Sequence, residues 1–123
     1  MNRDAIEKNP VLKLAFEFSL DVISFCEELE QQRKFIIARQ LLKSGTSIAA
    51  NAIEAQNSES FADFIHKFKV AAKEAEETEY WLLLCQFSSN YPNNDELLKK
   101  ITALNKIIGK IISSSKGKLS QKR

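Results

Sequence analysis

The sequence predicts an all-α fold, an antiparallel up-down-up-down four-helix bundle over residues 10–113. Apolar residues recur at alternating three- and four-residue steps in four segments, which is the spacing of one face of an α-helix. The 123 residues include only three glycines and two prolines, too few for the turns of a many-stranded sheet. Short polar breaks separate the four segments, and short connections favour antiparallel neighbours.

The first helix is predicted over residues 10–30, after an N-terminal extension of residues 1–9. Asn9 can cap it, and Pro10 suits the first helical position because proline has no amide hydrogen to leave unpaired. Its apolar residues form two neighbouring stripes: Val11, Ala15, Phe18, Val22, Phe25 and Leu29, and beside them Leu12, Phe16, Ile23 and Cys26. A face of this width predicts contact with more than one other helix.

The second helix is predicted over residues 33–55, and its apolar face is thin. The stripe consists of Ala38, Leu41, Gly45, Ile48, Ala52 and Ala55. Gly45 costs about 1 kcal/mol of helix propensity relative to alanine. Because small side chains let neighbouring helices approach closely, tighter packing can offset that cost.

The third and fourth helices are predicted over residues 60–88 and 94–113. Ser60 is a capping candidate just before the apolar residues of the third helix resume. Asn93, followed three residues later by Glu96, resembles a capping box at the start of the fourth helix. The remaining basic segment, residues 114–123, is predicted to be a disordered tail.

Charge alternates in sign along the chain. Residues 1–32 carry three basic and seven acidic groups, and residues 33–56 carry four and one. Residues 57–92 carry three and six, and residues 93–123 carry eight and two. This alternation favours packing of acidic helices against basic ones. The positive surplus of the last segment is either a solvated basic tail or a phosphate-contacting surface.

The residue types point away from an enzyme, a metal centre or a cofactor. A di-iron bundle takes carboxylates from four helices and two histidines, whereas the single His66, three residues after Asp63, supplies half of one such motif. Cys26 and Cys85 lack metal or redox spacing, so we expect buried thiols, with a disulfide as the alternative. No apolar run spans a membrane and no signal peptide is recognisable, so we expect a cytoplasmic protein.

Three polar residues on apolar helix faces form a candidate structural contact: Asn51, Glu54 and Glu79. A buried amide or carboxylate must find partners, or it costs about 1–3 kcal/mol. One interpretation is a hydrogen-bonded set that fixes the register of the second and third helices. The other is that the three groups lie at the edge of the bundle and are hydrated.

The last turns of the third helix carry a surplus of large apolar residues around the whole helix circumference. One bundle core accepts only one side of such a segment, and an exposed apolar patch marks a partner surface. We therefore predict contacts between copies of the chain at Tyr80, Trp81, Leu84 and Phe87. The alternative is that the loop around Tyr91 and Pro92, together with the N-terminal residues, covers this surplus.

The segment from Arg39 to Leu84 resembles a known family, the small four-helix-bundle proteins encoded in intervening sequences of 23S ribosomal RNA genes. The matching residues are Leu41, Ser44, Ser47 and Ile48, then Ala50-Asn51 and Glu54-Ala55, then Asp63-Phe64, Ala71, Lys73-Glu74-Ala75 and Glu77-Thr78-Glu79-Tyr80-Trp81-Leu82. The resemblance implies an antiparallel bundle that assembles as a homopentamer and has no catalytic residues. It also implies kinship with the accessory proteins of diversity-generating retroelements, which work with RNA.

Two functional hypotheses follow. The first is a non-enzymatic homo-oligomer that associates with ribosomal or other structured RNA, or with an RNA-associated protein. Its candidate RNA-binding residues are basic residues of the second and fourth helices: Arg33, Lys34, Arg39, Lys43, Lys99, Lys106 and Lys110. The second is a protein–protein scaffold or adaptor with no role in nucleic-acid binding.

Overall fold

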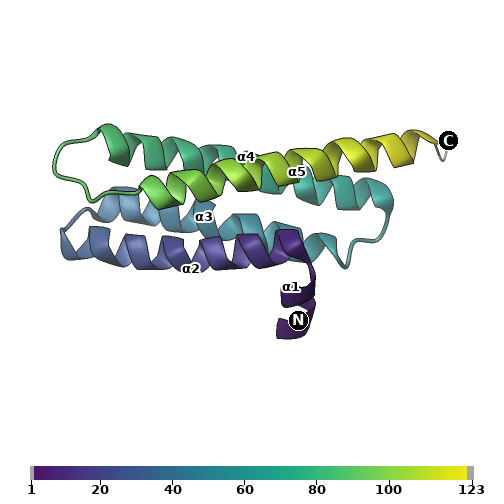
Figure 1. Cartoon of the computed structure of the whole chain (residues 1–123), viewed down its shortest axis with the longest axis horizontal. Coiled ribbons are helices and arrows are strands. Elements are labelled where there is room, and N and C mark those ends of the chain that lie inside the picture. The colour runs from purple at the N-terminus through teal and green to yellow at the C-terminus, as the bar shows by residue number, and fades with distance from the viewer. Residues whose placement is uncertain (1, 122–123) are drawn as a thin grey trace.

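The computed structural model describes residues 2–121, and every regular element in that range is an α-helix (Figure 1). The helices are α1 Arg3–Lys8, α2 Pro10–Gln31, α3 Phe35–Ala55, α4 Phe61–Phe87 and α5 Asp95–Gln121. The prediction of an all-α fold is therefore confirmed. The four long helices lie alongside one another, and the short α1 turns away from them at the start of α2. None of the helices within residues 2–121 is both long and apolar enough to cross a membrane.

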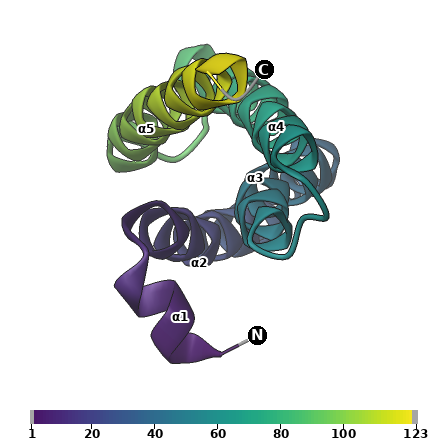
Figure 2. The same ribbon diagram turned by 90° about the vertical axis from the view of Figure 1, so that its right-hand side faces the viewer.

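Each long helix packs against the next one along the chain, and α2 also packs against α5. Figure 2 shows this order in end view. Within residues 2–121, the backbone of α2 does not closely approach that of α4, nor that of α3 the backbone of α5, so these pairs lie at opposite corners. The α2–α5 contact is less extensive than the other three. The core between the helices is filled mainly by Phe18, Phe68, Leu29, Leu41, Ile48, Leu82, Ile101, Leu104 and Ile108, all of which are fully buried.

The helix starts follow side-chain capping. Asn9 Oδ1 accepts a hydrogen bond from the Leu12 amide at 3.4 Å, with Pro10 at the first helical position of α2. Ser60 Oγ accepts from the Asp63 amide at 3.0 Å, and the Asp63 carboxylate accepts from the Glu59 amide at 3.2 Å. This reciprocal arrangement satisfies two backbone donors at the start of α4. The predicted caps at Asn9 and Ser60 are thus confirmed.

The structure shortens the predicted second helix and extends the fourth. α3 begins at Phe35 rather than residue 33, because Arg33 has a φ of 65°, in the left-handed region that a right-handed helix excludes. α5 continues to Gln121, so the prediction that residues 114–121 are disordered is wrong. The apolar spacing of α5 persists into this segment, where Ser115 is buried and Leu119 is half-buried. Residues 122–123 of the predicted tail lie outside the described residues.

Close approach of α2 and α3 depends on Gly45. A Cβ atom at this position would lie 2.9 Å from Val22 Cγ1 and 3.0 Å from Val22 Cγ2, closer than carbon atoms pack. Val22 is β-branched and fully buried, so it has little freedom to move aside. The thin face predicted for this helix therefore has a local cause, which is its contact with α2.

Candidate interaction surfaces

The buried polar contact between α3 and α4 is a pair of hydroxyl groups. Thr78 Oγ1 lies 2.9 Å from Ser44 Oγ and 2.7 Å from the Glu74 carbonyl oxygen of its own helix. Both side chains are fully buried. Because a slip of either helix would leave a buried hydroxyl without its partner, this pair favours one register.

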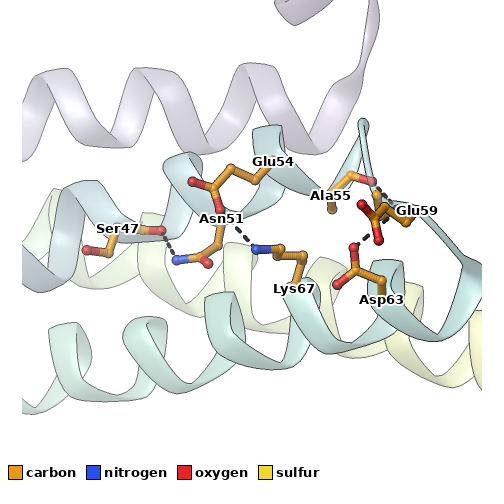
Figure 3. Close-up of polar contacts among 8 residues, drawn as sticks. Ser47, Asn51, Glu54, Ala55, Glu59, Asp63 and Lys67 are labelled. Carbon is orange, nitrogen blue, oxygen red and sulfur yellow. Dashed lines mark hydrogen bonds and ion pairs between the residues drawn. The ribbon is translucent and has the colours of Figure 1, made fainter.

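The predicted polar set of Asn51, Glu54 and Glu79 does not form, and Figure 3 shows the separate partners of Asn51 and Glu54. Asn51 Nδ2 donates to the Ser47 carbonyl oxygen at 2.9 Å, within its own helix. Glu54 instead accepts from Lys67 Nζ of α4 at 3.3 Å, in a surface ion pair. Such exposed pairs contribute about 0–1 kcal/mol.

The sequence interpretation placed Glu79 on the buried face of α4, which is one residue away from the position that is buried. Its buried positions run through Ala75, Thr78, Leu82 and Cys85, so the stripe passes through Thr78 and not through Glu79. One residue along a helix corresponds to a rotation of about 100°. Glu79 is accordingly only half-buried, and its carboxylate makes no hydrogen bond to a residue within 2–121. The three-four spacing of Ala75, Thr78 and Leu82 was a signal that could have identified the buried hydroxyl.

The last two turns of α4 present an exposed apolar stripe, which we call the α4 stripe: Tyr80, Leu83, Leu84 and Phe87. These residues follow the three-four spacing of one helix face, and Phe87 is 86% exposed. Trp81, predicted as a contact residue, instead packs against the core, and its buried Nε1 has no hydrogen-bond partner within residues 2–121. Leu83 belongs to the stripe although the sequence reasoning did not select it.

The loop between α4 and α5 does not cover this stripe. Tyr91 packs against the core, and its ring lies 4.7 Å from Lys34 Nζ, in a cation–π contact. Pro92 is half-buried, whereas Tyr80 remains 56% exposed. The alternative in which this loop masks the apolar surplus is therefore wrong for residues 2–121.

Other apolar residues are also exposed outside α4. On α2 they are Phe16, Leu20 and Ile23, and on α3 they are Phe35, Ile36 and Leu42. The sequence placed Phe16 and Ile23 on a stripe packed against a second helix. Both are nevertheless exposed, while Leu12 and Cys26 of the same predicted stripe are buried.

The basic residues fall into two separate groups. Arg33, Lys34, Arg39 and Lys43 lie on or just before α3, and Lys99, Lys106 and Lys110 lie on α5. Because α3 and α5 occupy opposite corners, the fold does not join the two groups into one patch. Lys34 contacts Tyr91, and Lys99 pairs with Glu96 at 3.5 Å. Arg33, Arg39, Lys43, Lys106 and Lys110 are exposed and form no ion pair with any residue in the described range.

The two cysteines are free and buried, as expected for structural thiols. Cys26 Sγ donates to the Ala38 carbonyl oxygen at 3.4 Å. Burial raises the pKa of Cys26 from 9.0 to about 12, with smaller contributions from Glu30 and Cys85. Burial also raises the pKa of Cys85 to about 11. Both groups are therefore neutral thiols, poor nucleophiles, at neutral pH.

Asp63 and His66 do not form a shared site in this structure. The Asp63 carboxylate takes part in the cap of α4, and His66 is exposed. Within residues 2–121, no three His, Cys, Asp or Glu side chains are grouped so that they could hold a metal ion.

These features define an all-helical protein whose exposed apolar and basic residues are its candidate interaction surfaces. The chain belongs to the 23S rRNA-intervening sequence protein family, whose sequence profile matches residues 7–113. It is also similar to a crystal structure of a protein of unknown function from the S23 ribosomal protein family of Bacteroides thetaiotaomicron. That structure is 38% identical in sequence, with a TM-score of 0.77, and the alignment covers 83% of this chain and 97% of the other. No curated protein matches the chain.

Proposed function

We propose that this chain is a non-enzymatic four-helix-bundle protein of the cytoplasm that assembles with copies of itself and associates with structured RNA. The observation that carries the proposal is the α4 stripe, an apolar surface that no residue within 2–121 covers. The helices α2 to α5 alternate in direction as an up-down-up-down bundle. The short connections and the packing of each helix on its sequence neighbour support this topology.

Self-association would cover the α4 stripe. Four large apolar side chains on adjacent turns form a continuous surface, and its burial removes apolar area from water at about 25 cal/mol per Å². Copies of the same chain are the simplest partner. We propose five copies, the number that the family resemblance implies.

RNA association would use the exposed cations of α3 and α5. Arg39, Lys43, Lys106 and Lys110 are free of ion pairs within residues 2–121, so no internal carboxylate competes with a phosphate for them. A single subunit offers two small groups at opposite corners. In an assembly each group recurs once per subunit, so weak phosphate contacts add through effective concentration. The RNA is ribosomal RNA or another structured RNA.

The test is the molar mass of the purified protein by light scattering, with the ratio of absorbance at 260 and 280 nm recorded on the same peak. The proposal predicts a mass of several subunits, an elevated ratio in low salt, and a decline of RNA affinity as salt increases. A monomer with no nucleic acid, and no retention of structured RNA at low salt, would contradict it.

A scaffold that binds another protein is a second candidate, and α3 carries the observation that favours it. Ile36 is 82% exposed and stands beside Phe35, so the basic group of α3 lies within a partly apolar surface. Apolar side chains at this density suit a protein partner better than a phosphate backbone. Recovery of one protein partner before and after nuclease treatment would favour the scaffold, and loss of that partner on nuclease treatment would favour RNA.

A further inference from the structure

An open hollow of about 570 Å³ lies between the start of α4 and the last turns of α5. Figure 1 shows these two segments at the same end of the bundle, the end that faces the viewer in Figure 2. We call it the α4–α5 hollow and define it by Phe61, Phe64, Ile111, Ser114, Ser115 and Lys118. Its volume is typical of a small-molecule pocket. None of these six residues belongs to the α4 stripe or to the candidate RNA-binding residues.

One wall of the hollow is aromatic and is held in place by the core. The Phe64 ring packs against the fully buried Phe68, with 4.9 Å between ring centroids. The Phe61 ring meets Phe64 edge to face at 6.0 Å. Ile111 of α5 also packs against the core. An apolar group that enters the hollow therefore meets a preformed surface, so little side-chain freedom has to be lost on binding.

Ser115 places an unpartnered hydroxyl group in the same hollow. The residue is only 7% exposed, and its hydroxyl makes no hydrogen bond within residues 2–121, unlike the buried hydroxyls of Ser44 and Thr78. The unpaired side-chain atoms that the described chain encloses completely are Trp81 Nε1 and Asn94 Oδ1. Ser115 Oγ is not enclosed in this way, so a group in the hollow that Ser115 lines can reach it. The site thus contains a buried hydrogen-bonding group that a ligand can satisfy.

The α5 wall of the hollow offers hydrogen-bond donors and positive charge. Ser114 and Lys118 share the helix face of Ser115 by their spacing, and neither has a side-chain partner in the described range. No acidic residue occurs in α5 after Glu96. The acid that lines the hollow is the exposed Glu59, which precedes α4 on the opposite side. A group with negative charge is therefore favoured against α5 and disfavoured beside Glu59.

We propose that the α4–α5 hollow binds a small carboxylate with an apolar body. The body would lie on the aromatic wall of Phe61 and Phe64, and the carboxylate would accept hydrogen bonds from Ser115 Oγ and Lys118 Nζ. Hydrogen bonds that involve charged groups are stronger than neutral ones. A hydrocarbon would leave Ser115 unsatisfied, and an inorganic anion would leave the aromatic wall exposed to water. The proposed ligand class satisfies both.

Calorimetric titration of the full chain with 3-phenylpropionate and with octanoate tests the ligand class. Saturable binding is expected with both probes, and the tighter one identifies an aryl or an alkyl body. 3-Phenylpropionamide and 3-phenylpropylamine keep the body but replace the anionic head with a neutral and a cationic one. They should bind at least about fivefold more weakly than 3-phenylpropionate. Acetate, which lacks the body, should give no measurable binding.

Protection of an introduced thiol places the ligand in the hollow. Ser114→Cys adds a thiol at an exposed lining position, and Ser113→Cys adds one at the adjacent exposed position, which does not line the hollow. The natural Cys26 and Cys85 are buried, so they do not compete for alkylation. Saturating 3-phenylpropionate should slow alkylation by iodoacetamide about threefold or more in the Ser114 variant. The rate in the Ser113 variant should stay within about 1.5-fold.

Matched variants separate the site from general attraction to a basic helix. Lys118→Gln should weaken binding of 3-phenylpropionate about fivefold, whereas Lys116→Gln, which does not line the hollow, should leave it within about twofold. Ser115→Ala should weaken binding about threefold without lowering the free energy of unfolding, because the hydroxyl has no partner within residues 2–121. Glu59→Gln should tighten binding, because it removes the opposing carboxylate.

The proposal is overturned if neither carboxylate binds saturably. Binding of the amide or the amine as tight as that of 3-phenylpropionate would overturn it as well. So would equal protection of the thiols introduced at positions 113 and 114, or equal losses in the Lys116 and Lys118 variants. None of these readouts depends on self-assembly or RNA, so the result stands apart from that of the proposed function.

Discussion

The two sides of the bundle are built differently. The side around α3 is closely packed, with Gly45 against Val22 and the buried hydroxyl pair of Ser44 and Thr78. The side between α2 and α5 has less contact, and charged groups such as Lys100 and Asp21 meet at its surface. Small side chains at a helix contact bring backbones together and exclude water. Where long charged side chains stand at the contact, as Lys100 and Asp21 do, the two helices share less contact.

The largest change in the free energy of unfolding is expected when a side chain is added at Gly45, on the closely packed side. Gly45→Leu should lower the free energy of unfolding by about 3 kcal/mol, because its Cβ alone would collide with Val22. Gly109→Leu is the matched control, since nothing lies within 4 Å of a Cβ at that position. It should raise stability by about 0.5–1 kcal/mol through helix propensity. Urea unfolding of both variants checks this, and equal losses would contradict the contrast between the two positions.

Buried thiols should make stability depend on alkaline pH. The unfolded chain releases thiol protons above pH 9.0, whereas burial keeps Cys26 protonated until about pH 12 and Cys85 until about pH 11. The unfolded state therefore binds fewer protons, so the free energy of unfolding falls as pH rises above 9.0. The loss should be about 1.4 kcal/mol per thiol for each pH unit up to the folded pKa.

Unfolding curves measured at pH 8 and at pH 10 check this dependence on the cysteines. The Cys85→Ala variant should show a clearly smaller difference between the two pH values than the natural chain. An unchanged difference would contradict the assignment to buried thiols.

The hydroxyl pair of Ser44 and Thr78 should contribute a smaller amount to the free energy of unfolding. Thr78→Val keeps the side-chain shape and should cost about 1–2 kcal/mol, because Ser44 is left without its buried partner. Adding Ser44→Ala should cost little more, since both hydroxyls are then absent. A double-mutant cycle measures the coupling, and additive losses would show that the two groups act independently.

The ion pair of Lys100 and Asp21, on the loosely packed side, should contribute least to the free energy of unfolding. Lys100 and Asp21 are about 40% exposed, so Asp21→Asn should cost at most about 1 kcal/mol. The pair raises the pKa of Lys100, so its contribution is present below the ordinary lysine pKa and is lost as pH rises through the raised value. The difference in unfolding free energy between the natural chain and Asp21→Asn, followed with pH, checks this. A cost above that of Thr78→Val would reverse the comparison of the two sides.

Local sequence signals predicted the helices well, and the limits of that prediction have physical causes. Asn9, Pro10 and Ser60 fixed the starts of α2 and α4 because capping is a local interaction. Thr78 was missed because the polar Glu79 beside it broke the apparent stripe by one residue. The exposure of Phe16 and Ile23 was missed, because helical spacing shows which residues share a face but not how much of that face another helix covers. Asn94 was not recognised either, since its partner is a carbonyl group twelve residues away.

The central claim is that the α4 stripe joins copies of the chain, and the molar mass of stripe variants tests it most directly. The double variant Leu84→Lys and Phe87→Lys changes only exposed residues, and lysine near the end of a helix interacts favourably with its dipole. With Gly109→Lys as a control for added charge, light scattering in high salt should give a monomer for the double variant. The natural chain and the control should both give a mass of several subunits. An assembly of unchanged mass in the double variant would contradict the claim.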